Sequence, residues 1–131
     1  MKRKFRGMLL GAVLILAACA QSDPAATVEA YLQAKVASDL DRMLSLSCAA
    51  WEGQAVIEAT SFESMNAELE GMDCQANGEA DGATRVDCQG QITTVYNGET
   101  RQWDLGAFPY RLVQEDGEWK MCGYFEEGGG Q

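Results

Sequence analysis

The sequence predicts an α+β domain in which three amphipathic helices precede a bent antiparallel sheet. Two observations carry this prediction. Apolar residues recur every three or four positions over residues 24–69, and every second position from about residue 83 onward. Two dipeptides typical of tight hairpin turns, Asn97-Gly98 and Asp116-Gly117, then divide the second half into strands.

The chain opens with the pattern of an export signal. The basic residues of MKRKFR precede the apolar stretch GMLLGAVLILAA, which is too short to cross a membrane as a helix. The following Leu16-Ala17-Ala18-Cys19 resembles a bacterial lipobox, in which the cysteine is acylated after cleavage. We therefore expect a lipoprotein signal peptide at 1–18, and a lipidated Cys19 with a short linker at 19–23. An ordinary signal peptide that contains a cysteine is the alternative.

This signal predicts an exported protein, held by its lipid on the extracytoplasmic face of the bacterial cell membrane. Ala20 after the lipidated position is compatible with the outer membrane of a Gram-negative host. Beyond residue 18, six basic residues remain against twenty acidic ones, a net charge of −14. Such a surface repels nucleic acid, so we exclude that partner. The charge is interpreted as a solubilising shell, with recognition of a cationic ligand as the alternative.

Four further cysteines lie in the exported part, and an even number in an oxidising compartment indicates two disulfides. A hairpin turn near Ala80-Asp81 places Cys74 directly opposite Cys88, which predicts that pair. Elimination leaves Cys48 with Cys122. Because strand alternation places Cys122 on the face away from the neighbouring apolar residues, the second pair requires a bulge or a place at the edge of the sheet.

A zinc site is the competing interpretation of these cysteines. Zinc usually takes cysteines two to four residues apart, or histidines, and the sequence contains neither. We therefore expect no metal and no cofactor.

The helices are predicted in order from capping signals and apolar spacing. Asp23-Pro24 starts the first, which covers roughly 24–38. Asp39 starts a short second helix. A third covers about 49–69 and ends at Gly71. The apolar positions of the three helices are Val28, Tyr31, Leu32 and Val36; Leu40, Met43 and Leu44; and Trp51, Ala55, Ala59, Phe62, Met65 and Leu69.

Three hairpins are predicted in the second half. The first covers residues 72–88. In the second, the Asn97-Gly98 turn places Trp103 opposite Ile92 and Leu105 opposite Gly90. In the third, Asp116-Gly117 sets Leu112 against Met121 and Gln114 against Trp119. The acidic and glycine-rich tail, 126–131, is expected to be disordered.

Two stretches of the sequence resemble segments of a known family. TVEAYLQAKVASDLDRMLSLSCAAW resembles the opening helices of the nuclear transport factor 2-like superfamily, and YRLVQEDGEWKMCGY resembles its closing hairpin. The resemblance implies a cystatin-like cone over 24–125, such as occurs in small exported lipoproteins. Members of the superfamily include isomerases, dehydratases and many non-catalytic binding or dimerisation modules, so the fold alone does not choose a function.

The sequence contains few residues that could act in catalysis. The chain has no histidine, which removes the usual proton carrier near neutral pH. A carboxylate buried in an apolar pocket could serve as a base instead. The four candidates, Glu58, Glu63, Asp73 and Asp104, are all predicted to be solvated surface groups. We therefore expect no catalytic residues and no enzymatic activity.

The functional expectation is a binding or accessory module. A sheet closed by a helix tends to leave an apolar hollow, and we expect it near Tyr31, Trp51, Phe62, Trp103, Phe108 and Tyr110. Tyr31, Tyr96 and the three tryptophans are also interpreted as core residues. The expected partner is a small apolar ligand or an envelope protein. The alternatives are an isomerase- or dehydratase-like enzyme with a buried carboxylate or tyrosine, and a homodimerisation module.

Overall fold

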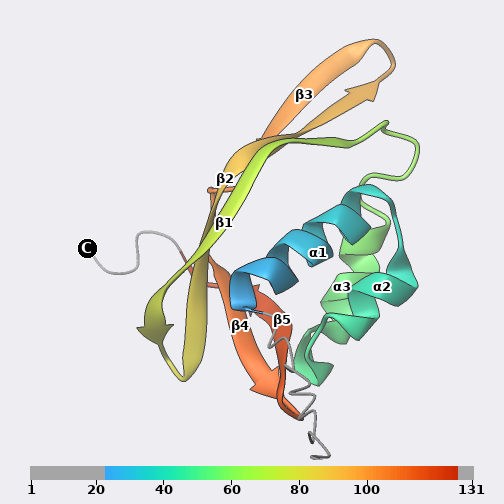
Figure 1. The fold of residues 1–131 in the computed structure, drawn as a ribbon. Coiled ribbons are helices and arrows are strands. Elements are labelled where there is room, and N and C mark those ends of the chain that lie inside the picture. Colours follow the sequence, from blue (N-terminus) through green and yellow to red (C-terminus); the bar gives the residue numbers. More distant parts are fainter. Residues whose placement is uncertain (1–22, 127–131) are drawn as a thin grey trace, which may run out of the picture.

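A computed structural model describes residues 23–126 and confirms an α+β fold. Figure 1 shows the helices gathered on one side of a curved, five-stranded antiparallel sheet. The helical segments are α1 (Pro24–Val36), α2 (Leu40–Ser45), the 3₁₀ turn η1 (Ala49–Trp51) and α3 (Glu52–Ala59). The strands are β1 (Glu68–Ala80), β2 (Ala83–Tyr96), β3 (Glu99–Asp104), β4 (Tyr110–Glu115) and β5 (Glu118–Tyr124). The predicted signal peptide, Cys19 and residues 127–131 lie outside the described residues.

The predicted helix starts are correct. The Asp23 carboxylate accepts a hydrogen bond from the amide of Ala26 at 2.8 Å, and Pro24 occupies the first turn of α1. The Asp39 carboxylate caps α2 in the same way through the amide of Arg42 at 3.1 Å. These side chains satisfy amides that a helix start leaves without partners.

The prediction for the third helix is wrong at its far end. It begins as η1, continues as α3 and stops at Ala59, so the predicted apolar stripe beyond that residue is not helical. Ser64 and Asn66 have φ values of 63° and 44°, which no helix tolerates. Leu69 already belongs to β1. The apolar residues beyond Ala59 keep a spacing of three and four positions by coincidence, although the chain there forms a turn and then a strand.

Both hairpins built on Asn-Gly and Asp-Gly turns are confirmed. Trp103 pairs with Ile92 across β2 and β3, and Leu112 pairs with Met121 across β4 and β5. The strand order is β1-β2-β4-β5, and β3 also pairs with β2. Because β3 and β4 follow one another along β2, the loop between them lies at the point where β2 changes partner.

Gly90 marks this point. Its φ is 101°, and a Cβ atom there would lie 2.6 Å from the backbone oxygens of Glu70 and Gly71. β1 has a register shift between Glu70 and Asp73, directly across from it. The bend in the sheet therefore requires a residue without a side chain.

The Cys74–Cys88 disulfide is present and joins directly paired residues of β1 and β2. The turn is one residue later than predicted, since Ala80 pairs with Ala83. A register shift between Ala76 and Glu79 compensates for this difference. The predicted partners are therefore correct because a bulge in β1 restores their alignment.

The Cys48–Cys122 disulfide is also present, together with the strand irregularity that the sequence analysis required for it. Between Met121 and Tyr124, β5 has one residue more than the facing segment of β4, which is a bulge at Cys122. The amide of Cys48 donates to the carbonyl of Met121 at 2.8 Å, so the chain after α2 runs along the edge of β5. Both expected conditions, a bulge and an edge position, are met together.

The core of the described residues lies between the helices and the sheet. Its largest fully buried side chains include Tyr31, Leu32, Met43, Leu112 and Met121. A fragment of residues 20–131 therefore contains all of this core. Two disulfides in a domain of this size indicate an oxidising, extracytoplasmic environment.

The two disulfides should differ in their contribution to stability. They close loops with sequence separations of 74 and 14 residues. In the chain-entropy model, the longer loop contributes about 4.5 kcal/mol and the shorter about 3 kcal/mol. Urea unfolding of the 20–131 fragment should show the larger loss for the Cys48→Ala/Cys122→Ala variant than for Cys74→Ala/Cys88→Ala. A larger loss for the shorter loop would contradict this account.

Candidate functional site

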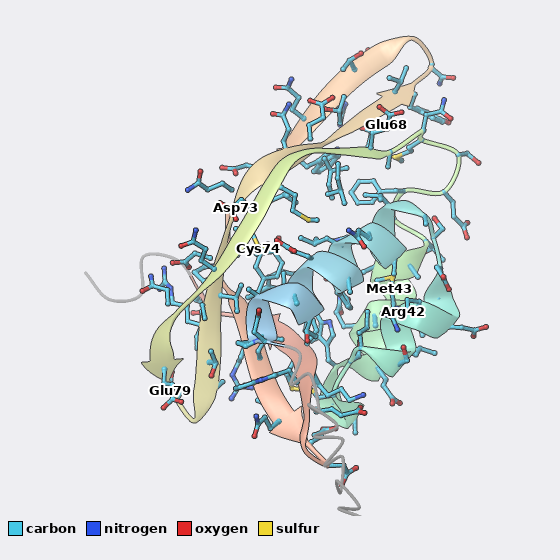
Figure 2. The ribbon with its side chains drawn as sticks, in the orientation of Figure 1. Arg42, Met43, Glu68, Asp73, Cys74 and Glu79 are labelled. Atoms are coloured by element: carbon cyan, nitrogen blue, oxygen red, sulfur yellow. A yellow bond between two sulfur atoms is a disulfide. The ribbon has the colours of Figure 1, made fainter. Side chains whose placement is uncertain are left out.

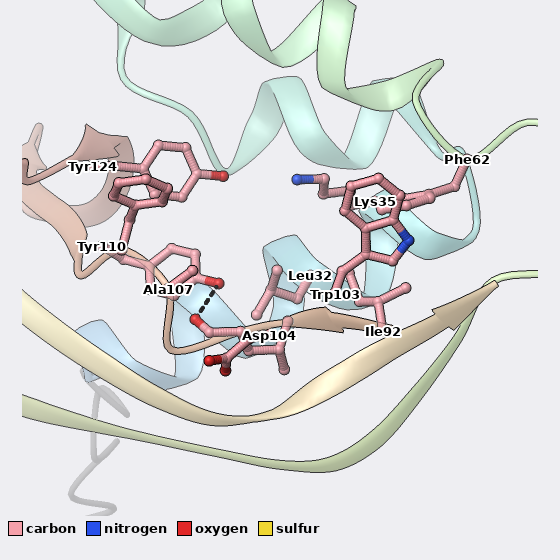
Figure 3. A pocket seen from close by; sticks show the side chains of 11 residues that line it. Leu32, Lys35, Phe62, Ile92, Trp103, Asp104, Ala107, Tyr110 and Tyr124 are labelled. Carbon is pink, nitrogen blue, oxygen red and sulfur yellow. Dashed lines mark hydrogen bonds between the residues drawn. The ribbon is translucent and has the colours of Figure 1, made fainter. Parts of the chain in front are cut away.

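A pocket of about 260 Å³ opens between α1 and the sheet where β2 changes partner. α1 and β3 contribute two residues each, the β3–β4 loop closes one side, and single residues come from β2, β4, β5 and the segment after α3 (Figure 3). The lining residues are Leu32, Lys35, Phe62, Ile92, Trp103, Asp104, Leu105, Ala107, Phe108, Tyr110 and Tyr124. Its volume is just below the range of about 300–1,000 Å³ usual for small-molecule sites.

Two aromatic pairs form facing walls. Phe62 and Trp103 meet edge to face with ring centroids 6.0 Å apart, and Tyr110 and Tyr124 lie 5.3 Å apart. Lys35 lies between the pairs, with its ammonium nitrogen 5.7 Å from the centre of the Phe62 ring (Figure 3). The site is thus an aromatic hollow with one cationic group inside it.

Four of the six residues expected near a hollow do line this pocket: Phe62, Trp103, Phe108 and Tyr110. Tyr31 and Trp51 do not line it. The indole N–H of Trp51 donates to the hydroxyl oxygen of Tyr31 at 3.1 Å. That hydroxyl donates to a carboxylate oxygen of Glu58 at 2.9 Å, so both residues belong to a buried network.

Glu58 is the centre of this network. It also accepts a hydrogen bond from the Tyr124 hydroxyl at 2.9 Å, and its Oε2 lies 3.2 Å from the ammonium nitrogen of Lys35. Only 8% of Glu58 is exposed. A buried carboxylate is tolerated when it is paired and hydrogen-bonded, and here both conditions hold.

The prediction that Glu58 is a solvated surface group is therefore wrong. The sequence did contain the signal, because Glu58 follows Ala55 by three positions and precedes Phe62 by four. It lies on the apolar stripe itself. Lys35 had a similar signal, four positions after Tyr31 on α1. Glu58 was judged to lie out of register with the apolar stripe, although its spacing places it on the buried face.

The other three candidate carboxylates are exposed. Asp73 points away from the helices in Figure 2. Asp104 lies at the rim of the pocket, and its carboxylate accepts the amide of Gly106 at 2.8 Å. Two aromatic side chains interpreted as core residues are in fact largely exposed. Tyr96 is 55% exposed, and Trp103 is 45% exposed because it forms a wall of the pocket.

The three tyrosines around Glu58 are hard to ionise. Burial raises the pKa of Tyr31, Tyr110 and Tyr124 well above the ordinary value of about 10, and the negative charge of Glu58 raises each pKa further. Each of these hydroxyls keeps its proton and acts as a hydrogen-bond donor. The Tyr110 hydroxyl donates to the carbonyl of Leu105 at 3.0 Å and so holds the β3–β4 loop against β4.

Fold and site together define an α+β domain with an aromatic-lined pocket above a buried ionic network. No model of a known protein family matches the chain, and no curated protein matches it either. None of the helices within residues 23–126 has the length and apolarity that a membrane crossing requires. The same residues contain no group of three or more side chains placed to hold a metal ion.

The buried tyrosines should make the domain sensitive to alkali. A group whose pKa is raised in the folded state binds its proton more tightly there than in the unfolded chain. The free energy of unfolding should therefore keep its full value up to about pH 10. Above that pH it should fall by up to about 1.4 kcal/mol per pH unit for each tyrosine. Chemical unfolding followed from pH 8 to 12 on the 20–131 fragment measures this slope.

Tyrosinate absorbance provides the check. The phenolates of Tyr31, Tyr110 and Tyr124 should appear together with the loss of circular dichroism, because only unfolding exposes them to hydroxide. Phenolate absorbance of all three tyrosines in a chain that is still folded would contradict the described burial.

Proposed function

We propose that this protein is an exported lipoprotein, anchored through Cys19, whose domain binds a small apolar ligand in the pocket without transforming it. The observation that carries the proposal is the hollow of about 260 Å³ with its aromatic walls. Leu32, Ile92 and Leu105, three buried residues, supply an apolar base. A concave site of this kind gains binding free energy by removing apolar ligand surface from water.

The state of Glu58 supports binding rather than catalysis. Its two oxygens are already occupied by Tyr31, Tyr124 and Lys35. It does not belong to the residues that line the pocket. A general base must come within hydrogen-bond reach of the proton that it removes. Glu58 would have to give up a partner and move before it could act on a ligand.

An enzyme of the isomerase or dehydratase type is the second candidate. The specific observation in its favour is that Glu58 is buried beside the pocket, since this class needs a carboxylate shielded from water. Lys35 and Tyr124 separate it from the pocket, however, and both contact it. The binding function needs no such rearrangement, which is why it is preferred.

Anchoring at Cys19 rests on the lipobox-like sequence and on the disulfides of the domain. Only three residues, Ala20 to Ser22, separate Cys19 from the cap of α1 at Asp23. The domain would then lie close to a membrane surface. The nuclear transport factor 2-like cone is part of the same proposal, supported by the order of helices and strands and by the curved sheet (Figure 1).

Lipidation can be tested directly. Metabolic labelling with radioactive palmitate should mark the wild-type protein, and the Cys19→Ala variant should carry no label and keep its signal peptide. The Cys48→Ala/Cys122→Ala variant is the matched control, because it loses two cysteines and should still be labelled. An unlabelled wild-type protein would contradict the anchor.

Binding can be tested with N-phenylnaphthylamine, an uncharged dye that fluoresces in apolar sites. The 20–131 fragment should bind it, and Phe108→Ala should weaken binding about fivefold, since a wall of the pocket loses its ring. Phe108 is 54% exposed, so the fold should survive the change.

Tyr96→Ala is the matched control for this experiment. Tyr96 is exposed to the same degree, 55%, and lies outside the pocket on the β2–β3 hairpin. The dye affinity of this variant should equal that of the wild type. If Tyr96→Ala weakened binding and Phe108→Ala did not, the dye would be bound on the hairpin and the proposed pocket would be wrong.

A further inference from the structure

The pocket contains one side-chain hydrogen-bond donor with unused capacity. An ammonium group has three N–H donors, and within residues 23–126 the polar partner of the Lys35 ammonium is Glu58 at 3.2 Å. Its side chain is only 15% exposed, so bulk water has limited access to it. Lys35 also lines the pocket, and Figure 3 shows its nitrogen reaching into the space between the aromatic pairs.

The other side-chain donors of the pocket are already engaged. The indole N–H of Trp103 donates to the hydroxyl of Thr94 at 3.2 Å. The Tyr110 hydroxyl donates to Leu105 and the Tyr124 hydroxyl to Glu58. A ligand in the pocket therefore meets mostly aromatic and aliphatic surface, with the Lys35 donor inside and the Asp104 carboxylate at the rim.

The charges around Lys35 decide what kind of acceptor fits. Glu58 and Lys35 neutralise each other, so an anionic ligand would leave one uncompensated negative charge in a poorly hydrated site. Asp104 at the rim and the overall acidity of the chain also oppose an anion. A cation would face the Lys35 ammonium. An uncharged acceptor uses the free donor and disturbs neither partner.

We propose that the ligand of this pocket is an uncharged, largely apolar molecule whose single carbonyl oxygen accepts a hydrogen bond from Lys35. This inference rests on the proposed binding function and names the ligand class for it. The carbonyl end lies between the two aromatic pairs, and the apolar body extends toward Ala107 and Phe108 at the β3–β4 loop. Lys35 is thus a binding residue as well as the partner of Glu58.

The test uses three related naphthalene dyes and the 20–131 fragment. The first is propionyl-dimethylaminonaphthalene, an uncharged ketone whose emission moves to longer wavelength when its carbonyl accepts a hydrogen bond. The second lacks the propionyl group, and the third carries a carboxylate in its place. The ketone should bind at least about tenfold more tightly than either, which is the effect of one charge-assisted hydrogen bond.

Substitution of Lys35 separates the hydrogen bond from simple apolar binding. Lys35→Met should weaken ketone binding about tenfold and shift its bound emission to shorter wavelength, and it should change the affinity of the unsubstituted dye less than twofold. Because this variant leaves Glu58 without its cation, the Lys35→Met/Glu58→Gln variant repeats the measurement with a neutral network.

Lys120→Met is the matched control. Lys120 is also a largely shielded lysine in an ion pair, 3.1 Å from Glu118, but it donates to the carbonyl of Ser45 and lies outside the pocket. This variant should bind the ketone as the wild type does, with unchanged emission.

Each outcome decides between the two proposals. Equal affinity for the ketone and the unsubstituted dye, with no effect of Lys35→Met on either dye, would overturn the ligand class and leave the binding function intact. Tighter binding of the carboxylate than of the ketone would do the same. If neither these dyes nor N-phenylnaphthylamine bind the wild-type fragment, the binding function itself fails.

Discussion

The arrangement of the helices and the sheet depends on the hydrogen bonds and the ion pair of the buried Glu58 carboxylate. Through Tyr31 and Lys35 it joins α3 to α1, and through Tyr124 it joins α3 to β5. Trp51 enters the same network from η1. A charge at this depth is stable only when every partner is in place, because an unpaired buried charge costs several kcal/mol. The network therefore fixes the distance between the helices and the end of the sheet, and that distance sets the size of the pocket.

The bend of β2 supplies the second constraint. At Gly90 the strand passes so close to β1 that no side chain fits, and beyond this point β2 leaves β4 and pairs with β3. The β3–β4 loop must cross the gap between the two pairings. Its residues, together with Phe62 from the helical side, enclose the space that the bent sheet cannot fill. The pocket is thus a consequence of the partner change in the sheet, and the Glu58 network supplies its polar end.

Much of this fold could be predicted from the sequence, because local chemistry determines it. Asn97-Gly98 fixes the register of the β2–β3 hairpin, and Asp23 fixes the start of α1. The end of α3 could not be predicted, since apolar spacing continues through Phe62 although the chain there turns. The pairing of Cys74 was predicted from a turn one residue too early, and a bulge in β1 corrected the error. Bulges depend on contacts across the sheet, which the local sequence does not contain.

The site was harder to predict than the fold for a related physical reason. The aromatic residues of the sequence predicted a pocket, and four of the six expected residues line it. The sequence does not show which ring faces the pocket and which lies behind it. Tyr31 lies behind because its hydroxyl donates to Glu58, and Trp51 lies behind because its indole N–H donates to that hydroxyl oxygen. A charged residue on an apolar stripe is therefore more informative than one more aromatic residue. Such a charge must find a buried partner of opposite sign. On α1 the spacing from Tyr31 leaves Lys35 as the cation that reaches Glu58, and its ammonium group is the one side-chain donor of the pocket with capacity left for a ligand.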